Sequence, residues 1–405
     1  MERKPKSGRS LPLDGVRILA ISQFGAGPFA TSLLADLGAE VVKIEDPRTG
    51  GDSARTVPPF LIGGADSLYF QSFNRNKKSV ALNLEDERGR AVFHRLVTQA
   101  RVVFNNLRGD LPERLGLTYE ALARHNPRIV CCSLSGFGRS GPRRADPGYD
   151  NLIQALAGYM ALTGEPGGPP TKCGVSVIDF AGGYAAMIGL LVALFDAERT
   201  GVGRDVDVGL LDTAVHMLNY LAIWYLNEGF QPGRITDSGH PVLVPAQNFA
   251  TVDGTVAVVC FKEKFWERLC DRIGRSDLAE DPRFLRFADR LAHKAELIAI
   301  LRPLFATRTT AEWVRILSGQ IPCAAVNDLP AALADPQILA RDMIIEIEHP
   351  TRGRVREVGS PIKLEGSSMP LAPAPALGQH TSEILREAGI SAEEIAALRR
   401  DRIIA

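Results

Sequence analysis

Continuous apolar runs alternate with amphipathic runs along the first third of the chain. The continuous runs cover residues 16–22, 40–45, 79–84, 101–106 and 128–135, and their lengths suit strands that are buried on both faces. Helix-like stretches lie between them at 29–38 and 85–100, and Gly38 is a natural stop for the first of these helices. The alternation predicts an α/β fold, with a Rossmann-like, doubly wound large domain.

The pattern becomes helical after Gly148. Residues 149–164 are amphipathic, 165–174 form a Pro/Gly-rich loop, Asp179 opens a long apolar helix, and residues 205–229 begin as a short strand and continue as a helix. A further change near residue 230 leads into a predicted hairpin at 249–260, with its turn at Asp253-Gly254. We therefore expect a large domain at 1–230, a smaller α+β domain at 231–325, and a segment at 326–405 that returns to the large domain.

Composition and charge narrow the possible partners. The 405 residues carry 47 basic and 47 acidic side chains, so no net charge favours nucleic acid or an anionic membrane. The six cysteines form no C-x-x-C pair, which favours reduced thiols in a cytoplasmic protein over a metal site. The apolar run at 180–195 is short for a membrane span and predicts a buried core helix. We expect no tightly bound cofactor.

A glycine turn follows the first apolar run. Gly25, Gly27 and Ala30 have the spacing G-x-G-x-x-A, and Glu45 ends the next apolar run, which is close to the fingerprint of a nicotinamide-dinucleotide site. The start of a helix binds phosphate, carboxylate or thiolate by the same backbone N–H groups. A dinucleotide site, a site for another anionic ligand, and a tight turn without a ligand all remain open on this pattern alone.

Asp179 is a second candidate for chemistry, and two interpretations compete for it. Asp is a favoured N-cap residue, so the carboxylate can simply cap the helix that follows. Alternatively it lies in an apolar setting beside the small residues Ala181, Gly182 and Gly183, which would leave it desolvated and approachable. A carboxylate of this kind can attack an activated acyl group, and nearby backbone N–H groups can stabilise the oxyanion that forms.

Longer motifs then make a family resemblance visible. The chain carries, in order, "LPLDGVRIL", "GAGPFATSLLADLGAEVVKIE", "NRNKKSVALNL", "ERLGLTYEALARHNPRIVCCSLSGFG", "GYDNLIQALAGYMALTGEPGGPP", "GVSVIDFAGGYAAMIGLLVALFDAERTGVG" and "LGQHTSEILREAGIS". Together they resemble the class III CoA-transferases, the family of formyl-CoA:oxalate and carnitine CoA-transferases, over about residues 11–404.

The resemblance implies a reaction and an assembly. CoA would move from an acyl-CoA donor to a carboxylic acid acceptor, with Asp179 as the covalent nucleophile that forms an anhydride and then an aspartyl-CoA thioester. CoA is then a substrate rather than a bound cofactor. The family also implies an interlocked homodimer, which long connections near residues 200–230 and 325–345 would permit.

The resemblance also implies contacts with CoA. The glycine turn would line the thiol end of CoA, the strand at 79–84 would meet its adenosine part, Arg114 would bind a CoA phosphate or hold the site, and the "GYD" segment would lie beside the active centre. Taken alone, Arg108 and Arg114 would be surface charges and Tyr149 a packed aromatic side chain. The full set of expected CoA contacts is Gly25, Ala26, Leu82, Asn83, Asn106, Leu107, Arg108, Arg114, Tyr149 and Asp150.

Departures from the family pattern qualify these expectations. Asn105 replaces an acid, Arg108 is followed by Gly109-Asp110 instead of Pro-Gly, and Asp46 stands where some relatives carry an arginine that meets CoA.

Acyl-CoA racemases of the same fold family have "GHD" where this chain has "GYD", so Tyr149 replaces their basic histidine and transfer is favoured over racemisation. An oxidoreductase stays a remote alternative. His240 is either a substrate contact or part of the loop structure.

Overall fold

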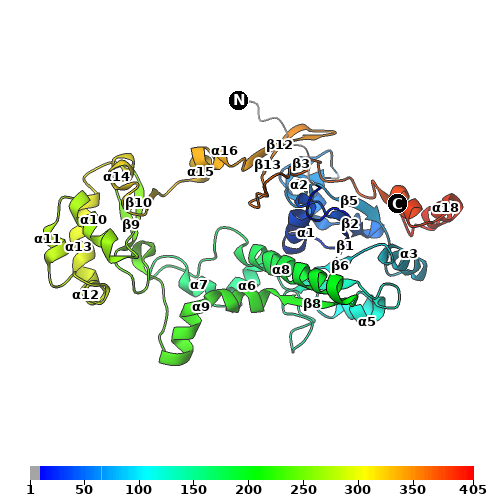
Figure 1. Cartoon of the computed structure of the whole chain (residues 1–405), viewed down its shortest axis with the longest axis horizontal. Helices are drawn as coiled ribbons and strands as arrows, with labels where there is room; N and C mark the ends of the chain where they lie inside the picture. The colour runs from blue at the N-terminus through cyan, green and yellow to red at the C-terminus, as the bar shows by residue number, and fades with distance from the viewer. Residues whose placement is uncertain (1–9, 65) are drawn as a thin grey trace. The chain divides into compact units, whose positions relative to one another are not determined.

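The computed structural model describes residues 10–64 and 66–405 (Figure 1). The chain divides into two compact units. The first takes in the residues up to Ala157 together with 174–219 and 339–405, and the second is formed by 158–173 and 220–338. The sequence pattern predicts boundaries at 230 and 325, whereas the structure divides the chain at 219 and 338 and assigns residues 158–173 to the second unit.

The first unit is built on a parallel sheet of six strands, counted over the described residues. Each strand pairs in parallel with its neighbours, in the order β5-β2-β1-β6-β7-β8. Chain order reverses between β1 and β6, so the loops after these two strands leave a crevice at their carboxyl ends. The bounds are β1 (Arg17–Ile21), β2 (Glu40–Glu45), β5 (Lys78–Ala81), β6 (Val102–Asn105), β7 (Val130–Ser135) and β8 (Arg204–Gly209).

Helices cover both faces of this sheet (Figure 1), which confirms the expected α/β fold with a parallel sheet. Helices α1 (Ala26–Asp36) and α8 (Val177–Thr200) pack together on one face. Helices α3 (Glu87–Val97), α17 (Thr381–Glu387) and α18 (Ala392–Arg400) bury apolar side chains on the other. The remaining elements of this unit are η1 (Pro47–Thr49), η2 (Ser53–Thr56), β3 (Leu61–Ile62), β4 (Asp66–Ser67), α2 (Leu68–Asn74), α4 (Leu111–Arg114), α5 (Tyr119–Leu122), α6 (Asp150–Leu156), β12 (Ile344–His349) and β13 (Gly353–Val358). Helix α16 (Pro336–Ala340) begins in the second unit and ends in the first.

Two glycines let α8 approach its neighbours closely. A Cβ atom on Gly183 would lie 2.8 Å from Phe29 Cδ1 and 3.1 Å from the carbonyl oxygen of Ala26, both on α1. A Cβ atom on Gly182 would lie 2.4 Å from Leu210 Cδ2. These small residues therefore serve helix packing, and the packing brings the start of α8 next to the start of α1.

The expected helix at 149–164 is instead two helices, α6 and α7 (Tyr159–Leu162). Gly158 between them has φ +86°, a left-handed conformation that ends a helix and that glycine adopts readily. The chain passes from the first unit to the second at this glycine. The amphipathic pattern of 149–164 could not show this break, because it continues on both sides of the glycine.

The second unit combines a small antiparallel sheet with helices. Strands β9 (Ala246–Ala250) and β10 (Thr255–Val259) form the predicted hairpin, and β11 (Cys323–Ala325) pairs with β10. Aromatic side chains such as Trp266, Phe305 and Trp313 fill its core. Helix α9 (Leu210–Glu228) enters this unit after a break at Asn219. The other elements are η3 (Thr236–Ser238), α10 (Glu263–Arg272), α11 (Asp277–Glu280), α12 (Phe287–Ala292), α13 (Lys294–Phe305), α14 (Thr310–Leu317) and α15 (Leu329–Leu333).

Candidate active site

Asp179 and the glycine turn meet at the crevice between β1 and β6. Asp179 is the third residue of α8, and a Cβ atom on Gly25 would lie 3.0 Å from Asp179 Oδ2. Any larger residue at position 25 would press against the carboxylate. Both residues line a cavity of about 310 Å³, together with Gln23, Phe24, Ala26, Ser53, Asn106, Leu107, Arg108, Leu111, Leu134, Ser135, Gly136, Pro147, Gly148, Tyr149 and Leu210. Residues more than 150 positions apart thus form one site.

Asp179 does not cap its own helix, because Asp150 does so from α6. The N–H groups of Ile178 and Asp179 both donate to Asp150 Oδ1, at 2.8 and 3.4 Å, and Gln154 Nε2 donates to Asp150 Oδ2 at 2.6 Å. Ser176, at the N-cap position, makes no side-chain capping bond. Within residues 10–64 and 66–405, no donor lies at hydrogen-bond distance from the Asp179 carboxylate. The capping interpretation of Asp179 is therefore wrong, and its side chain is free for chemistry.

The surroundings of Asp179 hold its pKa high. Burial, and then the negative charge of Asp150, raise the pKa of Asp179 from 3.8 to about 6. A carboxylate with this pKa is mostly ionised at neutral pH, yet it is more basic than a surface aspartate, which suits a nucleophile.

The amino-terminal N–H groups of the two helices differ in availability. On α8 the first four N–H groups already have acceptors. Val177 N donates to Val175 O, and Phe180 N donates to Ser176 O. The N–H groups of Ile178 and Asp179 donate to Asp150 Oδ1. On α1 the N–H groups of Gly25, Ala26 and Gly27 have no acceptor among the residues that the structure describes. The expectation that N–H groups beside Asp179 bind an oxyanion is therefore wrong. The N–H groups of the glycine turn are the ones that remain available to bind it.

Asn106 fixes the glycine turn. Its Oδ1 accepts from Gln23 N at 2.9 Å and its Nδ2 donates to Gln23 O at 2.8 Å, so one amide side chain pairs with both backbone groups of that residue. Gly27 makes room for it, since a Cβ atom there would lie 2.7 Å from Asn106 Cγ. Asn105, which replaces the usual acid, is fully buried and donates to Ser133 Oγ at 2.9 Å. Asn106 thus lines the cavity and holds the turn, whereas Asn105 is part of the interior of the sheet.

Glu45 is not free to meet the ribose of a dinucleotide. The guanidinium of Arg55 binds its two carboxylate oxygens at 2.7 and 2.9 Å, and Ser79 Oγ donates to it at 2.7 Å. Glu45 and Arg55 are both buried. Glu45 therefore belongs to the interior of the sheet, and the acidic residue that a nicotinamide site needs is missing here.

Some of the expected CoA contacts lie outside this cavity. Leu82 is buried in the core and bridges to Ile404, and Asn83 is buried with its N–H donating to Ile403 O. Arg114 is exposed on α4, and its closest ion-pair partner is Asp110 at 3.8 Å. Asp150 is not among the lining residues either, since it is buried and caps α8. Contacts of these four residues with CoA stay predictions, as do those of the residues that line the cavity.

Comparison with known proteins identifies the family. The family model described as CoA-transferase family III matches residues 13–381. The acetyl-CoA:oxalate CoA-transferase of Acetobacter aceti is 38% identical over 91% of this chain and 92% of its own length. The succinyl-CoA:mesaconate CoA-transferase of Haloarcula hispanica is 37% identical over 93% of this chain and 96% of its own length. The chain belongs to the class III CoA-transferase family.

A solved structure agrees with this assignment. The crystal structure of a CaiB/BaiF family protein from Brucella suis is 33% identical, covers 94% of this chain and all of its own, and superposes with a TM-score of 0.80. The resemblance drawn from the sequence motifs is thereby confirmed, and so is the expectation of a class III CoA-transferase enzyme. The dinucleotide interpretation of the glycine turn is wrong.

Tyr69, which the sequence pattern did not single out, lies close to the Asp179 carboxylate. Tyr69 packs against Phe24, with ring centroids 5.5 Å apart, and its hydroxyl would lie 3.8 Å from a Cβ atom on Gly25. Burial, and then the charge of Asp179, raise the pKa of Tyr69 above its usual value. Tyr149, which stands where racemases have histidine, lines the cavity with its side chain 59% exposed. No histidine is among the described residues that line this cavity.

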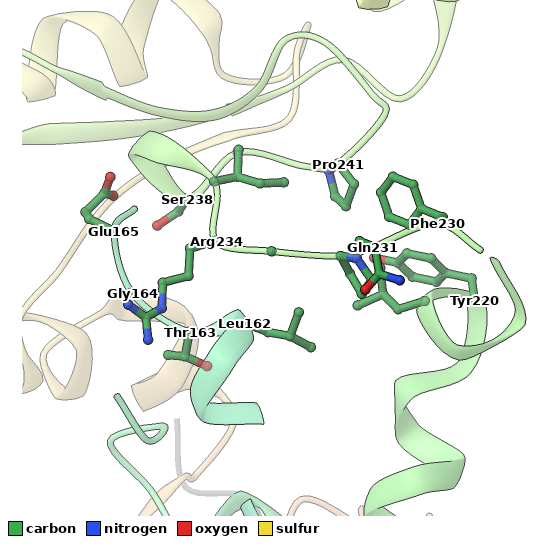
Figure 2. Close-up of a pocket in the computed structure, with 15 residues that line it drawn as sticks. Leu162, Thr163, Gly164, Glu165, Tyr220, Phe230, Gln231, Arg234, Ser238 and Pro241 are labelled. Carbon is green, nitrogen blue, oxygen red and sulfur yellow. The ribbon is translucent and has the colours of Figure 1, made fainter. Parts of the chain in front are cut away.

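A second cavity of about 690 Å³ lies in the second unit (Figure 2). Arg234 and Glu165 lie on one side of it, and Tyr220 and Phe230 on the other. Its two charged side chains already make hydrogen bonds within the unit, between segments 158–173 and 230–245. Arg234 Nη2 donates to Met160 O at 3.0 Å, and Glu165 Oε1 accepts from Asp237 N at 3.0 Å.

His240 makes hydrogen bonds within the loop at 230–245. Its Nδ1 accepts from Leu243 N at 3.1 Å and from Val242 N at 3.3 Å, which places the proton of a neutral ring on Nε2. Burial, and then Lys294, lower its pKa. The contacts of His240 that the structure shows are those of a loop residue.

Proposed function

We propose that the chain moves CoA from an acyl-CoA donor to a small carboxylic acid by covalent catalysis at Asp179. The observation that carries this proposal is the carboxylate itself: it is partly buried, released from capping by Asp150, and adjacent to the unused N–H groups of α1. At neutral pH about nine tenths of a carboxyl group with a pKa near 6 is ionised. The nucleophile is thus available in its reactive form.

Each step exchanges one acyl bond for another. Asp179 attacks the thioester carbonyl of the donor, which forms a mixed anhydride and releases CoA thiolate. The thiolate attacks the aspartyl carbonyl, which frees the donor acid and leaves an aspartyl-CoA thioester. The acceptor carboxylate then attacks this thioester, forms a second anhydride and releases the thiolate again. Finally the thiolate takes the acceptor acyl group, and Asp179 returns as a carboxylate.

Two anionic species need stabilising in this sequence, the thiolate and the tetrahedral oxyanions. The N–H groups of Gly25 and Ala26 at the start of α1 supply donors and the positive end of the helix dipole. Because Asp150 uses the corresponding groups of α8, the glycine turn is the better candidate for this role.

The names of the relatives suggest acids to try. The Acetobacter relative is named for acetyl-CoA and oxalate, and the Haloarcula relative for succinyl-CoA and mesaconate. We therefore propose small carboxylic acids of this kind as acceptors, with acetyl-CoA and succinyl-CoA as the first donors to test. CoA enters and leaves as a substrate, without a tightly bound cofactor.

Trapping the covalent intermediate tests the proposal. The protein is incubated with each donor and then with hydroxylamine, and peptides are analysed by mass spectrometry. We expect a hydroxamate or CoA adduct at Asp179, and we expect Asp179→Ala to abolish transfer while CoA binding remains. Transfer that persists in Asp179→Ala would contradict the mechanism. Exchange of the α-proton of the donor without any adduct would favour the racemase alternative.

An apolar face on α8 supports the proposed homodimer. Ile188, Val192 and Phe195 follow one another at helical spacing and are 59%, 63% and 65% exposed. Among the described residues α8 is also the one helix long and apolar enough to cross a membrane, a test that buried core helices pass as well. We propose that a second copy of the chain covers this face, interlocked as in the family, in a cytoplasmic protein that binds neither membrane nor nucleic acid.

Light scattering tests the assembly. The molar mass measured for the wild type should be twice its chain mass of 43.9 kDa, and Val192→Glu should shift the measured mass toward that of the monomer. A monomeric wild type would contradict the proposal. Flotation with vesicles should leave the protein in the aqueous fraction, and a floating protein would instead indicate that lipid covers α8.

A further inference from the structure

A buried ion pair lies directly beneath the glycine turn. Lys43 on β2 and Asp52 are both buried, and Lys43 Nζ lies 2.8 Å from Asp52 Oδ2. Both residues also reach the turn itself: Lys43 Nζ donates to the carbonyl oxygen of Ser22, and Asp52 Oδ1 accepts from Phe24 N at 3.1 Å. Two segments of the chain thus hold the turn by its backbone.

The backbone conformation at Phe24 explains why the turn needs this support. Phe24 has φ +67°, the left-handed region that a bulky side chain rarely adopts. Its N–H group is bound to Asp52, and its neighbour Gln23 is bound to Asn106 on both backbone groups. The next residue is Gly25, which faces the Asp179 carboxylate. Releasing Phe24 would let it relax and would carry Gly25 and the start of α1 with it.

We propose that Asp52, held by Lys43, is a positioning residue for CoA transfer, fixing Phe24 in its left-handed conformation and so holding the amino terminus of α1 against Asp179. The inference rests on the proposed function, because it takes Asp179 and the N–H groups of α1 as the reacting centre. Asp52 acts through the turn and does not need to touch the substrate.

Two double variants isolate the contact with Phe24. Both carry Lys43→Met, which removes the buried charge at position 43. Asp52→Asn then keeps an Oδ1 acceptor for Phe24 N, whereas Asp52→Leu does not. The destabilisation from losing the ion pair is common to the two variants, so their difference reports the loss of the Oδ1 acceptor. Oδ1 accepts from Phe24 N and also from Ala54 N at 2.9 Å, where Asp52 caps η2. Asp328→Leu, which removes an aspartate cap from α15 in the second unit, is the control for a simple loss of helix capping.

We expect Lys43→Met/Asp52→Asn to keep kcat within about threefold of the wild type. Lys43→Met/Asp52→Leu should lose about 100-fold in kcat, the order expected for a misplacement of about 1 Å, with a much smaller change in KM for acyl-CoA. The acid limb of the kcat profile should stay near pH 6 in Lys43→Met/Asp52→Asn, because there the glycine turn and Asp150 keep their places beside Asp179. Equal kcat values in the two variants, whether high or low, would overturn the proposal.

Hydrogen exchange tests the contact in the wild type without relying on a variant that folds. The Phe24 amide should exchange slowly, whereas the Gly25 amide, which has no acceptor in the described part of the chain, should exchange fast. A fast Phe24 amide would overturn the proposal. Failure of the proposed function is seen separately, as a wild type that forms no adduct at Asp179.

Discussion

Replacing Asp179 by asparagine should stabilise the protein while it abolishes CoA transfer. The carboxylate is partly buried, has no hydrogen-bond donor within reach among the described residues, and is close to the charge of Asp150. Its ionised form is therefore unfavourable in the folded state. Asparagine has nearly the same shape and removes this charge.

The size and the pH dependence of the effect follow from the pKa. Raising the pKa of Asp179 from 3.8 to about 6 corresponds to a free-energy cost of about 3 kcal/mol for the ionised form. Because the side chain is partly solvated, we expect about 1 to 3 kcal/mol. The folded state binds the proton more tightly than the unfolded state does, so this cost is absent below pH 3.8, grows as the pH rises and is complete above about pH 6.

Urea unfolding at several pH values measures this prediction. At pH 7.5 Asp179→Asn should be more stable than the wild type by the stated amount, and at pH 4 the two should nearly coincide. Asp146→Asn, in an exposed pair with Arg143, is the control and should change stability by less than about 0.5 kcal/mol at either pH. A difference between Asp179→Asn and wild type that is zero at pH 7.5, or that is the same at both pH values, would refute the reasoning.

Three further predictions concern the same site. Asp150→Asn keeps an oxygen acceptor for the α8 N–H groups but removes a charge, so the acid limb of kcat, set by Asp179 near pH 6, should move to lower pH; an unmoved limb would exclude Asp150 as a cause of the raised pKa. Gly183→Val should lower kcat and destabilise the fold by at least about 1 to 3 kcal/mol, measured by urea unfolding, because its side chain would meet α1. Arg108→Met should raise KM for acyl-CoA more than Arg114→Met does, since Arg108 lines the cavity; the opposite order in steady-state kinetics would contradict this placement.

The inner strands of the large sheet could be predicted from the sequence because they are buried on both faces, unlike β8 at its edge. The runs 40–45 and 101–106 each have an apolar centre, Val41-Val42 and Val102-Val103-Phe104, and in the structure they are adjacent to β1 at the centre of the sheet. The limits of the two units were harder to predict from the sequence. They depend on Gly158 and on the break at Asn219, where single residues change the backbone direction inside otherwise helical patterns.

The nucleophile could be predicted, but the residues that prepare it could not. The position of Asp179 before small residues, together with the family resemblance, singled it out. That Asp150 caps α8 from another helix depends on tertiary contact between segments 29 positions apart, and local sequence shows only an aspartate after a tyrosine. Lys43 and Asp52 look like ordinary charges in the sequence, because their burial arises only when the sheet is assembled.

The two aspartates of this site illustrate how the fold divides two roles that one residue could not fill. A carboxylate at the start of a helix normally binds the free N–H groups, which lowers its energy as an anion and makes it a weaker nucleophile. Here Asp150 accepts from those N–H groups and adds a negative charge nearby. Asp179 is left with a raised pKa and with no hydrogen-bond donor among the residues that the structure describes. The cost of that partly buried charge is what Asp179→Asn should recover as stability. On this argument the stability gained and the activity lost in that one variant have the same physical origin.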